Sequence, residues 1–88
     1  MKSIWKFPLE LREEQVVEMP LDSKILSVAD QGGQIVIWAE VYTEHRTEQV
    51  FFHIFGTGAV IPPSRCQRHY IGTVQLNRLV WHIYRVEV

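Results

Sequence analysis

The sequence contains a single cysteine, Cys66, among its 88 residues. No internal disulfide can form, although small secreted domains usually need such cross-links to supplement a small core. The sequence also lacks an apolar run of the about 20 residues that cross a bilayer as a helix. Its start, Met1–Lys6, lacks the apolar stretch of a signal peptide. These absences predict a cytoplasmic protein without a membrane partner.

An excess of charge of either sign is missing as well. The 9 basic and 10 acidic residues give a formal net charge of -1. Binding to duplex nucleic acid through its phosphates needs a clear basic excess, so we expect no duplex partner. Hydrophobic residues make up 47% and charged residues 22%, which is ordinary globular composition and excludes a disordered chain.

The length allows one domain, which would span residues 1–88. A compact chain of 10.4 kDa has a folded surface of roughly 5,400 Å², against about 15,000 Å² when unfolded. Folding therefore buries roughly 64% of the surface, enough for one modest core and no second domain.

Runs of β-branched and aromatic residues, separated by turn residues, predict strands along most of the chain. The clearest strands are Lys24–Ala29, Gln34–Thr43, Gln49–Phe55, Tyr70–Gln75 and Leu79–Val88. Paired glycines at 32 and 33 predict a tight hairpin, because glycine accepts a positive φ. Residues 59–68, with Pro62 and Pro63, predict an irregular loop.

The first twenty residues are harder to interpret. Trp5–Phe7 alternates like a strand, and Gln15–Met19 before Pro20 also fits a strand. One helical turn within 9–19 is the alternative, and we favour the strand. No segment has an apolar period of 3.6 residues. The expected fold is therefore all-β, with about seven mostly antiparallel strands in a meander that forms a barrel or a sandwich.

Three of these strands are apolar on both faces, whereas a half-solvated strand is polar on one. In Gln34–Thr43 one face carries Ile35, Ile37, Ala39 and Val41, and the other carries Val36, Trp38, Glu40 and Tyr42. Large exposed apolar patches are rare on monomers. A second copy of the chain is the simplest cover, so we expect a homo-oligomer. The alternative is that barrel curvature and the first twenty residues provide the cover.

No constellation of catalytic or metal-binding residues is visible. His53 and His82 lie in separate strands, and two ligands are too few for a zinc site. No serine has the context of a nucleophile elbow, and no phosphate-binding fingerprint precedes a helix. We therefore expect no enzyme activity, no metal and no cofactor.

One region has the donors of a small anion site. The backbone amides of Gly56, Thr57 and Gly58 would form an anion-binding nest. Arginine side chains of the following loop would bind phosphate through bidentate hydrogen bonds, and an aromatic ring would stack on a base. The other candidate ligand-binding residues are Arg65, Arg68, His69, Tyr70, Thr73 and Trp81. The alternative is a β-bulge followed by a solvated arginine loop.

Several motifs carry a resemblance to a known family: W-K-F-P-L at residues 5–9, G-T-G-x-x-I-P at 56–62, Y-I-G-T-V-Q at 70–75 and V-W-H at 80–82. In this order, and over nearly the whole chain, the sequence resembles a family of small bacteriophage and prophage proteins of unknown function. The resemblance implies a phage accessory protein and supplies no catalytic residues.

Small accessory phage proteins often act by binding. By analogy, the leading hypothesis is a non-enzymatic protein that counteracts host defence by sequestering a small nucleotide-type signal. The alternatives are an inhibitor that binds a host protein and a minor structural component of the virion.

Overall fold

The computed structural model describes residues 1–88 as seven β-strands and no helix, as the sequence predicts. The strands are β1 (Lys2–Leu9), β2 (Glu14–Pro20), β3 (Lys24–Gln31), β4 (Gln34–Tyr42), β5 (Thr47–Gly56), β6 (Gln67–Leu76) and β7 (Leu79–Glu87). The first twenty residues therefore form two strands, and the helical turn considered within 9–19 is absent. None of the segments is a helix with the length and apolar character that spanning a bilayer requires.

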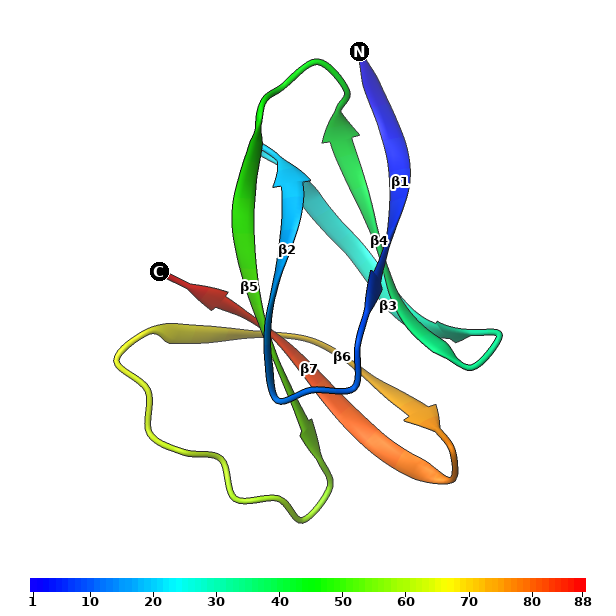
Figure 1. Ribbon diagram of the computed structural model, residues 1–88, viewed down its shortest axis with the longest axis vertical. Coiled ribbons are helices and arrows are strands. Elements are labelled where there is room, and N and C mark those ends of the chain that lie inside the picture. Colours follow the sequence, from blue (N-terminus) through cyan, green and yellow to red (C-terminus); the bar gives the residue numbers. More distant parts are fainter.

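The strands form two antiparallel sheets packed as a sandwich (Figure 1). Sheet A has the order β1-β4-β3 and sheet B the order β2-β5-β7-β6. The expected sequential meander is wrong in this respect, because only β3–β4 and β6–β7 pair as hairpins of consecutive strands. The chain changes sheets after β1, after β2 and after β4, so β1 pairs with β4 and β2 pairs with β5.

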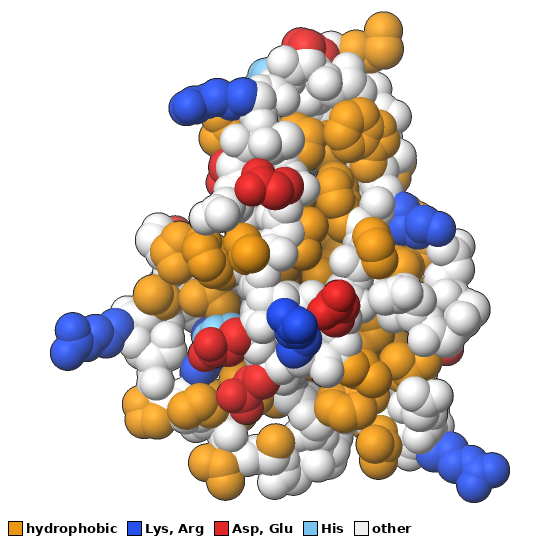
Figure 2. Space-filling model, in the orientation of Figure 1, with side chains coloured by type: hydrophobic (Ala, Val, Ile, Leu, Met, Phe, Trp, Pro, Cys, Tyr) orange, Lys and Arg blue, Asp and Glu red, His pale blue; other side chains and the backbone are white.

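The core lies between the two sheets. Its central side chains, Ile37, Ala39, Val41, Phe52 and Ile83, are each 0% exposed. Of the two apolar faces of Gln34–Thr43, the one that carries Ile35, Ile37, Ala39 and Val41 lies in this core. The Cα extents of 41 × 33 × 16 Å describe a flattened molecule, and its exposed surface is 5832 Å². Figure 2 shows that hydrophobic side chains form several groups among the charged ones on one broad face of this molecule.

The turns have the chemistry that their backbone requires. Gly32 and Gly33 have φ values of 59° and 85°, and the Asp30 carboxylate accepts a hydrogen bond from Gly33 N at 2.9 Å. The turn between β6 and β7 places Asn77 and Arg78 at φ 54° and 66°. Two consecutive positive φ values define the type of two-residue turn that matches the twist of a hairpin.

The connection between β5 and β6 differs from the others. Both strands are antiparallel to β7, which lies between them, so they run in the same direction. Residues 57–66 therefore return from the end of β5 to the opposite end of the sheet, and we call this segment the crossover loop. Figure 1 shows it as a wide arc beside sheet B.

At one side of the sandwich, β3 and β6 approach each other closely. β6 has an irregular register between Tyr70 and Gly72, where Ile71 is an extra residue relative to β7. A Cβ atom added to Gly72 would lie 2.7 Å from Cγ1 of Val28 in β3. The absence of a side chain at position 72 therefore allows the two edge strands to close this side of the core.

Candidate functional site

The outer face of sheet B, the side turned away from sheet A, carries an unusual set of aromatic and histidine side chains. The register places Arg68 opposite Val86, Tyr70 opposite Tyr84, and Thr73 opposite His82 on this side. In β5, His53 and Phe55 lie on the same side, opposite Tyr84 and His82. The alternation of side chains along the strands therefore gathers residues of β5, β6 and β7 on one surface.

Arg68 is half-buried on this face, and its charge has no carboxylate partner. Its Nε donates a hydrogen bond to Nδ1 of His53 at 2.9 Å, and its guanidinium carbon lies 5.2 Å from the centre of the Phe55 ring. Burial lowers the pKa of His53, and the positive charge of Arg68 lowers it further. His53 is therefore neutral at pH 7 and acts as an acceptor. The Glu14 carboxylate lies 3.8 Å from Nε2 of His53, and no carboxylate lies within ion-pair distance of Arg68 itself.

A row of aromatic rings continues from this guanidinium. The ring centres of His53 and Phe55 are 5.7 Å apart, those of Phe55 and Tyr84 6.0 Å, and those of Tyr84 and Tyr70 5.7 Å. All three pairs have the edge-to-face arrangement that aromatic quadrupoles favour. Phe55 is 3% exposed and Tyr70 is 59% exposed, so the row begins covered and ends open to solvent.

His82 joins the end of this row to the crossover loop. Its Nε2 lies 2.8 Å from Oγ1 of Thr57, and its Nδ1 lies 3.0 Å from Oγ1 of Thr73. The hydroxyl of Tyr70 is hydrogen-bonded to the same Thr73 oxygen. Both ring nitrogens of His82 therefore have hydroxyl partners, and this histidine orients the crossover loop and the side chains of Thr57 and Thr73.

The segment Gly56–Gly58 is a turn with few free amides. Thr57 N donates to Val80 O at 3.0 Å, and Ala59 N donates to Gly56 O at 3.0 Å. Gly58 occupies a left-handed conformation with φ 90°, which completes the turn. The Thr57 amide is therefore used within the fold, so it is not available for the three-amide nest expected from the sequence, whereas the Gly58 amide has no acceptor within the protein.

Two of the expected site residues lie on the opposite side of the sheet. His69 is adjacent to Tyr70 in the strand and points the other way, and its Nε2 contacts Glu87 at 2.9 Å. Trp81 precedes His82, and a Cβ atom added to Gly56 would lie 3.3 Å from its ring; its Nε1 donates to Leu76 O at 3.3 Å. The alternation of the pleat explains both placements.

The structure thus brings together Thr57, Arg68, Tyr70 and Thr73 from the expected set. Arg65 lies exposed in the crossover loop, three residues before Arg68. Four further members of the surface, His53, Phe55, His82 and Tyr84, were not among the expected site residues. The alternation of Phe51, His53 and Phe55, and of His82 and Tyr84, is the sequence signal that identifies them.

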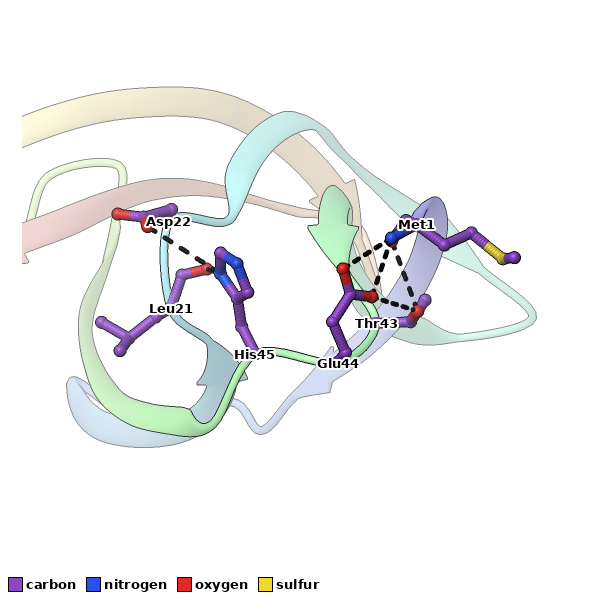
Figure 3. A network of polar contacts seen from close by, with 6 residues as sticks. All are labelled: Met1, Leu21, Asp22, Thr43, Glu44 and His45. Carbon is purple, nitrogen blue, oxygen red and sulfur yellow. Dashed lines mark hydrogen bonds and ion pairs between the residues drawn. The ribbon is translucent and has the colours of Figure 1, made fainter.

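A separate polar network lies at the far end of the sandwich (Figure 3). The N-terminal amine contacts the Glu44 carboxylate at 2.6 Å, and this ammonium group, through its hydrogen bond, lowers the pKa of Glu44 to about 2. Nδ1 of His45 lies 2.9 Å from the carbonyl oxygen of Leu21. These contacts connect the turn after β4 to the start of β1 and to the turn after β2, so their role is structural.

No three His, Cys, Asp or Glu side chains converge to hold a metal ion, and Cys66 is a half-buried free thiol. Fold and surface together define a small all-β sandwich protein with an aromatic and histidine-rich sheet face. The chain belongs to the family described as Domain of unknown function (DUF7352), which matches residues 1–88. No curated protein and no solved structure is significantly similar to it.

Proposed function

We propose that this protein is a non-enzymatic binding protein that holds a small nucleotide-type ligand on the outer face of sheet B. The observation that carries the proposal is the guanidinium of Arg68, which is half-buried against Phe55 and bonded only to a neutral histidine. An arginine without a carboxylate partner attracts an anion, and its two terminal nitrogens are free for bidentate binding of a phosphate.

The surroundings of Arg68 fit the rest of a nucleotide. Tyr70 follows two residues later on the same face, roughly 6.6 Å further along the strand, and its ring is exposed. Bases stack on aromatic rings of sheet surfaces in many single-stranded nucleic-acid binders. Arg65 and the Gly58 amide of the crossover loop would supply further donors. The ligand would therefore place its phosphate at Arg68 and its base on Tyr70.

The biological setting follows from the resemblance to phage proteins. In this proposal the protein acts as a homo-oligomer in the cytoplasm of a bacterial host, where it sequesters a nucleotide signal of host defence. Sequestration needs binding and release without chemistry, and the features that carry the proposal, the Arg68 guanidinium and the exposed Tyr70 ring, are binding features. The surface therefore supports binding better than catalysis.

Titration calorimetry with a panel of mononucleotides and cyclic dinucleotides tests the proposal. The variant Arg65→Ala with Arg68→Met removes both charges and keeps an apolar stem over Phe55. Each charge-assisted hydrogen bond contributes about 1.5–3 kcal/mol, so affinity should fall at least tenfold. Arg46→Ala, which removes a charge in the turn after β4, is the matched control. Absence of binding across the panel, or equal affinity of the double variant, would overturn the proposal.

A second candidate function is supported by the crossover loop itself. Val60 is 87% exposed and Ile61 is 48% exposed, and they precede Pro62 and Pro63. An exposed apolar segment beside two prolines suits recognition by another protein, as expected of an inhibitor of a host protein. This candidate predicts a stable complex with a host protein. The complex should be lost in the variant Val60→Asp with Ile61→Asp, and added nucleotides should not change it. Co-purification of the tagged protein from a bacterial host, with that variant as control, measures it.

A further inference from the structure

The outer face of sheet B has an apolar area with acidic margins at its β2 side. Val16 is 47% exposed and Val88 is 81% exposed, and both line a cavity of about 430 Å³ together with Phe51 and Val86. Two carboxylates of β2, Glu14 and Glu18, flank Val16 on the same side of the strand. This area is distinct from the Tyr70 end of the face, and we call it the acidic face.

The outer face of sheet A has the opposite character. The register places Ile4 and Lys6 of β1 beside Glu40 and Trp38 of β4, and Ile4 is 59% exposed. Its charged side chains are Lys2, Lys6, Lys24 and Glu40. Lys2 contacts the Glu40 carboxylate at 3.3 Å, which leaves Lys6 and Lys24 as a net positive margin. We call this area the basic face.

Each face is the outer side of its own sheet, so the two faces point away from each other across the core. If two acidic faces contacted each other, four carboxylates would lie close together across the interface. If two basic faces did so, the lysines of both copies would lie close together. Like charges across an interface cost several kcal/mol, whereas complementary charges set orientation and register. An apolar centre on each face supplies the area that association buries.

We propose that the basic face of one copy docks on the acidic face of a second copy. Lys6 and Lys24 would face Glu14 and Glu18, while Ile4 and Trp38 would cover Val16 and Phe51. Such a contact is heterologous, so the pair keeps one unused acidic face and one unused basic face. The assembly would therefore grow into a ring or a chain instead of stopping at a two-fold dimer. The inference specifies the self-association in the proposed function and does not depend on the ligand.

Sedimentation velocity over a concentration series tests the docking with two charge-reversed variants. Lys6→Glu with Lys24→Glu removes the basic face, and Glu14→Lys with Glu18→Lys removes the acidic face. We expect species larger than a dimer for the native chain and monomers for each variant. An equimolar mixture of the two variants should again give species larger than a dimer, because the native faces pair with each other and the two reversed faces pair with exchanged charges.

The control is Arg46→Glu with Arg78→Glu, which changes the net charge as much as Lys6→Glu with Lys24→Glu but at two turns outside the faces. This control should associate like the native chain. Circular dichroism verifies that each variant is folded. The native chain provides an independent measurement, because its association should weaken between about 0.1 M and 1 M salt as the screening length shortens. A native monomer at all concentrations, association of either face variant alone, a mixture that stays monomeric, or insensitivity to salt would each overturn the inference. Nucleotide binding is measured separately, so its failure leaves this result interpretable.

Discussion

Gly72→Ala probes the close approach of β3 and β6 with a single methyl group. The backbone of Gly72 has no positive φ, so alanine is compatible with the strand. The added Cβ would lie 2.7 Å from Cγ1 of Val28, a separation that carbon atoms do not tolerate. Val28 is β-branched and has few alternative rotamers in a strand, so the two strands must move apart or one side chain must leave its preferred rotamer.

The size of the effect follows from two opposing contributions. Overpacking of a well-packed contact costs about 1–3 kcal/mol. Replacing glycine by alanine restricts the unfolded chain, which stabilises the protein by about 0.4–1 kcal/mol. The free energy of unfolding should therefore fall by roughly 0.5–2 kcal/mol. A loss of about 1 kcal/mol lowers Tm by about 4–8 °C in a domain of this size.

Urea denaturation followed by tryptophan fluorescence measures this loss. Val28→Ala removes the methyl group that the new Cβ meets, so the pair forms a double-mutant cycle. We expect Gly72→Ala to be tolerated better in the Val28→Ala background, with a coupling free energy of about 0.5–2 kcal/mol. An unchanged urea midpoint for Gly72→Ala, or a coupling near zero, would refute the close packing of these two edge strands.

Three further predictions concern other parts of the chain. Phe52 is 0% exposed, so Phe52→Ala should lower the free energy of unfolding by about 3–5 kcal/mol in urea denaturation; a loss below about 1 kcal/mol would contradict its central place in the core. Arg78 has φ 66°, so Arg78→Gly should stabilise the turn by roughly 0.5–1 kcal/mol, seen as a higher Tm; a lower Tm would contradict it. The pKa of His53 lies below its usual value of 6.5, so the unfolded chain binds more protons as the pH falls below that value. The free energy of unfolding should therefore decrease as the pH falls below 6.5, until His53 is protonated in both the folded and the unfolded state. In urea denaturation, His53→Gln should remove this contribution to the pH dependence of the free energy of unfolding. An unchanged pH dependence in that variant would contradict the role of His53 as a neutral acceptor.

The strands and turns were predictable because their signals are local. Alternation in Gln34–Thr43 identified β4 and the members of its two faces, and the glycines at 32 and 33 identified the hairpin. The pairing of β1 with β4 and of β2 with β5 was not predictable, since it joins segments far apart in the sequence. Local sequence patterns do not specify with which distant strand a given strand pairs.

The candidate site depended on the same distant pairings. Arg68 and Tyr70 were recognisable as a basic and an aromatic residue of one segment, and alternation alone places them on one side of β6. The partnership of Arg68 with His53, however, requires β7 to lie between β5 and β6. His69 and Trp81 were misplaced because a cluster of suitable residues in the sequence was treated as a cluster in space, without regard to the pleat.

The crossover loop also sets a limit on chain length. Gly56 lies opposite Trp81 and Gln67 lies opposite Glu87, so the loop returns six residues along β7 and moves two strands sideways. At about 3.3 Å per residue and about 4.8 Å per strand, its ends are roughly 22 Å apart. About seven extended residues cover that span, and residues 57–66 provide ten. The loop is therefore roughly three residues longer than the span requires, so it tolerates a short deletion and longer insertions. The surface of the protein can change at this segment while both sheets stay the same.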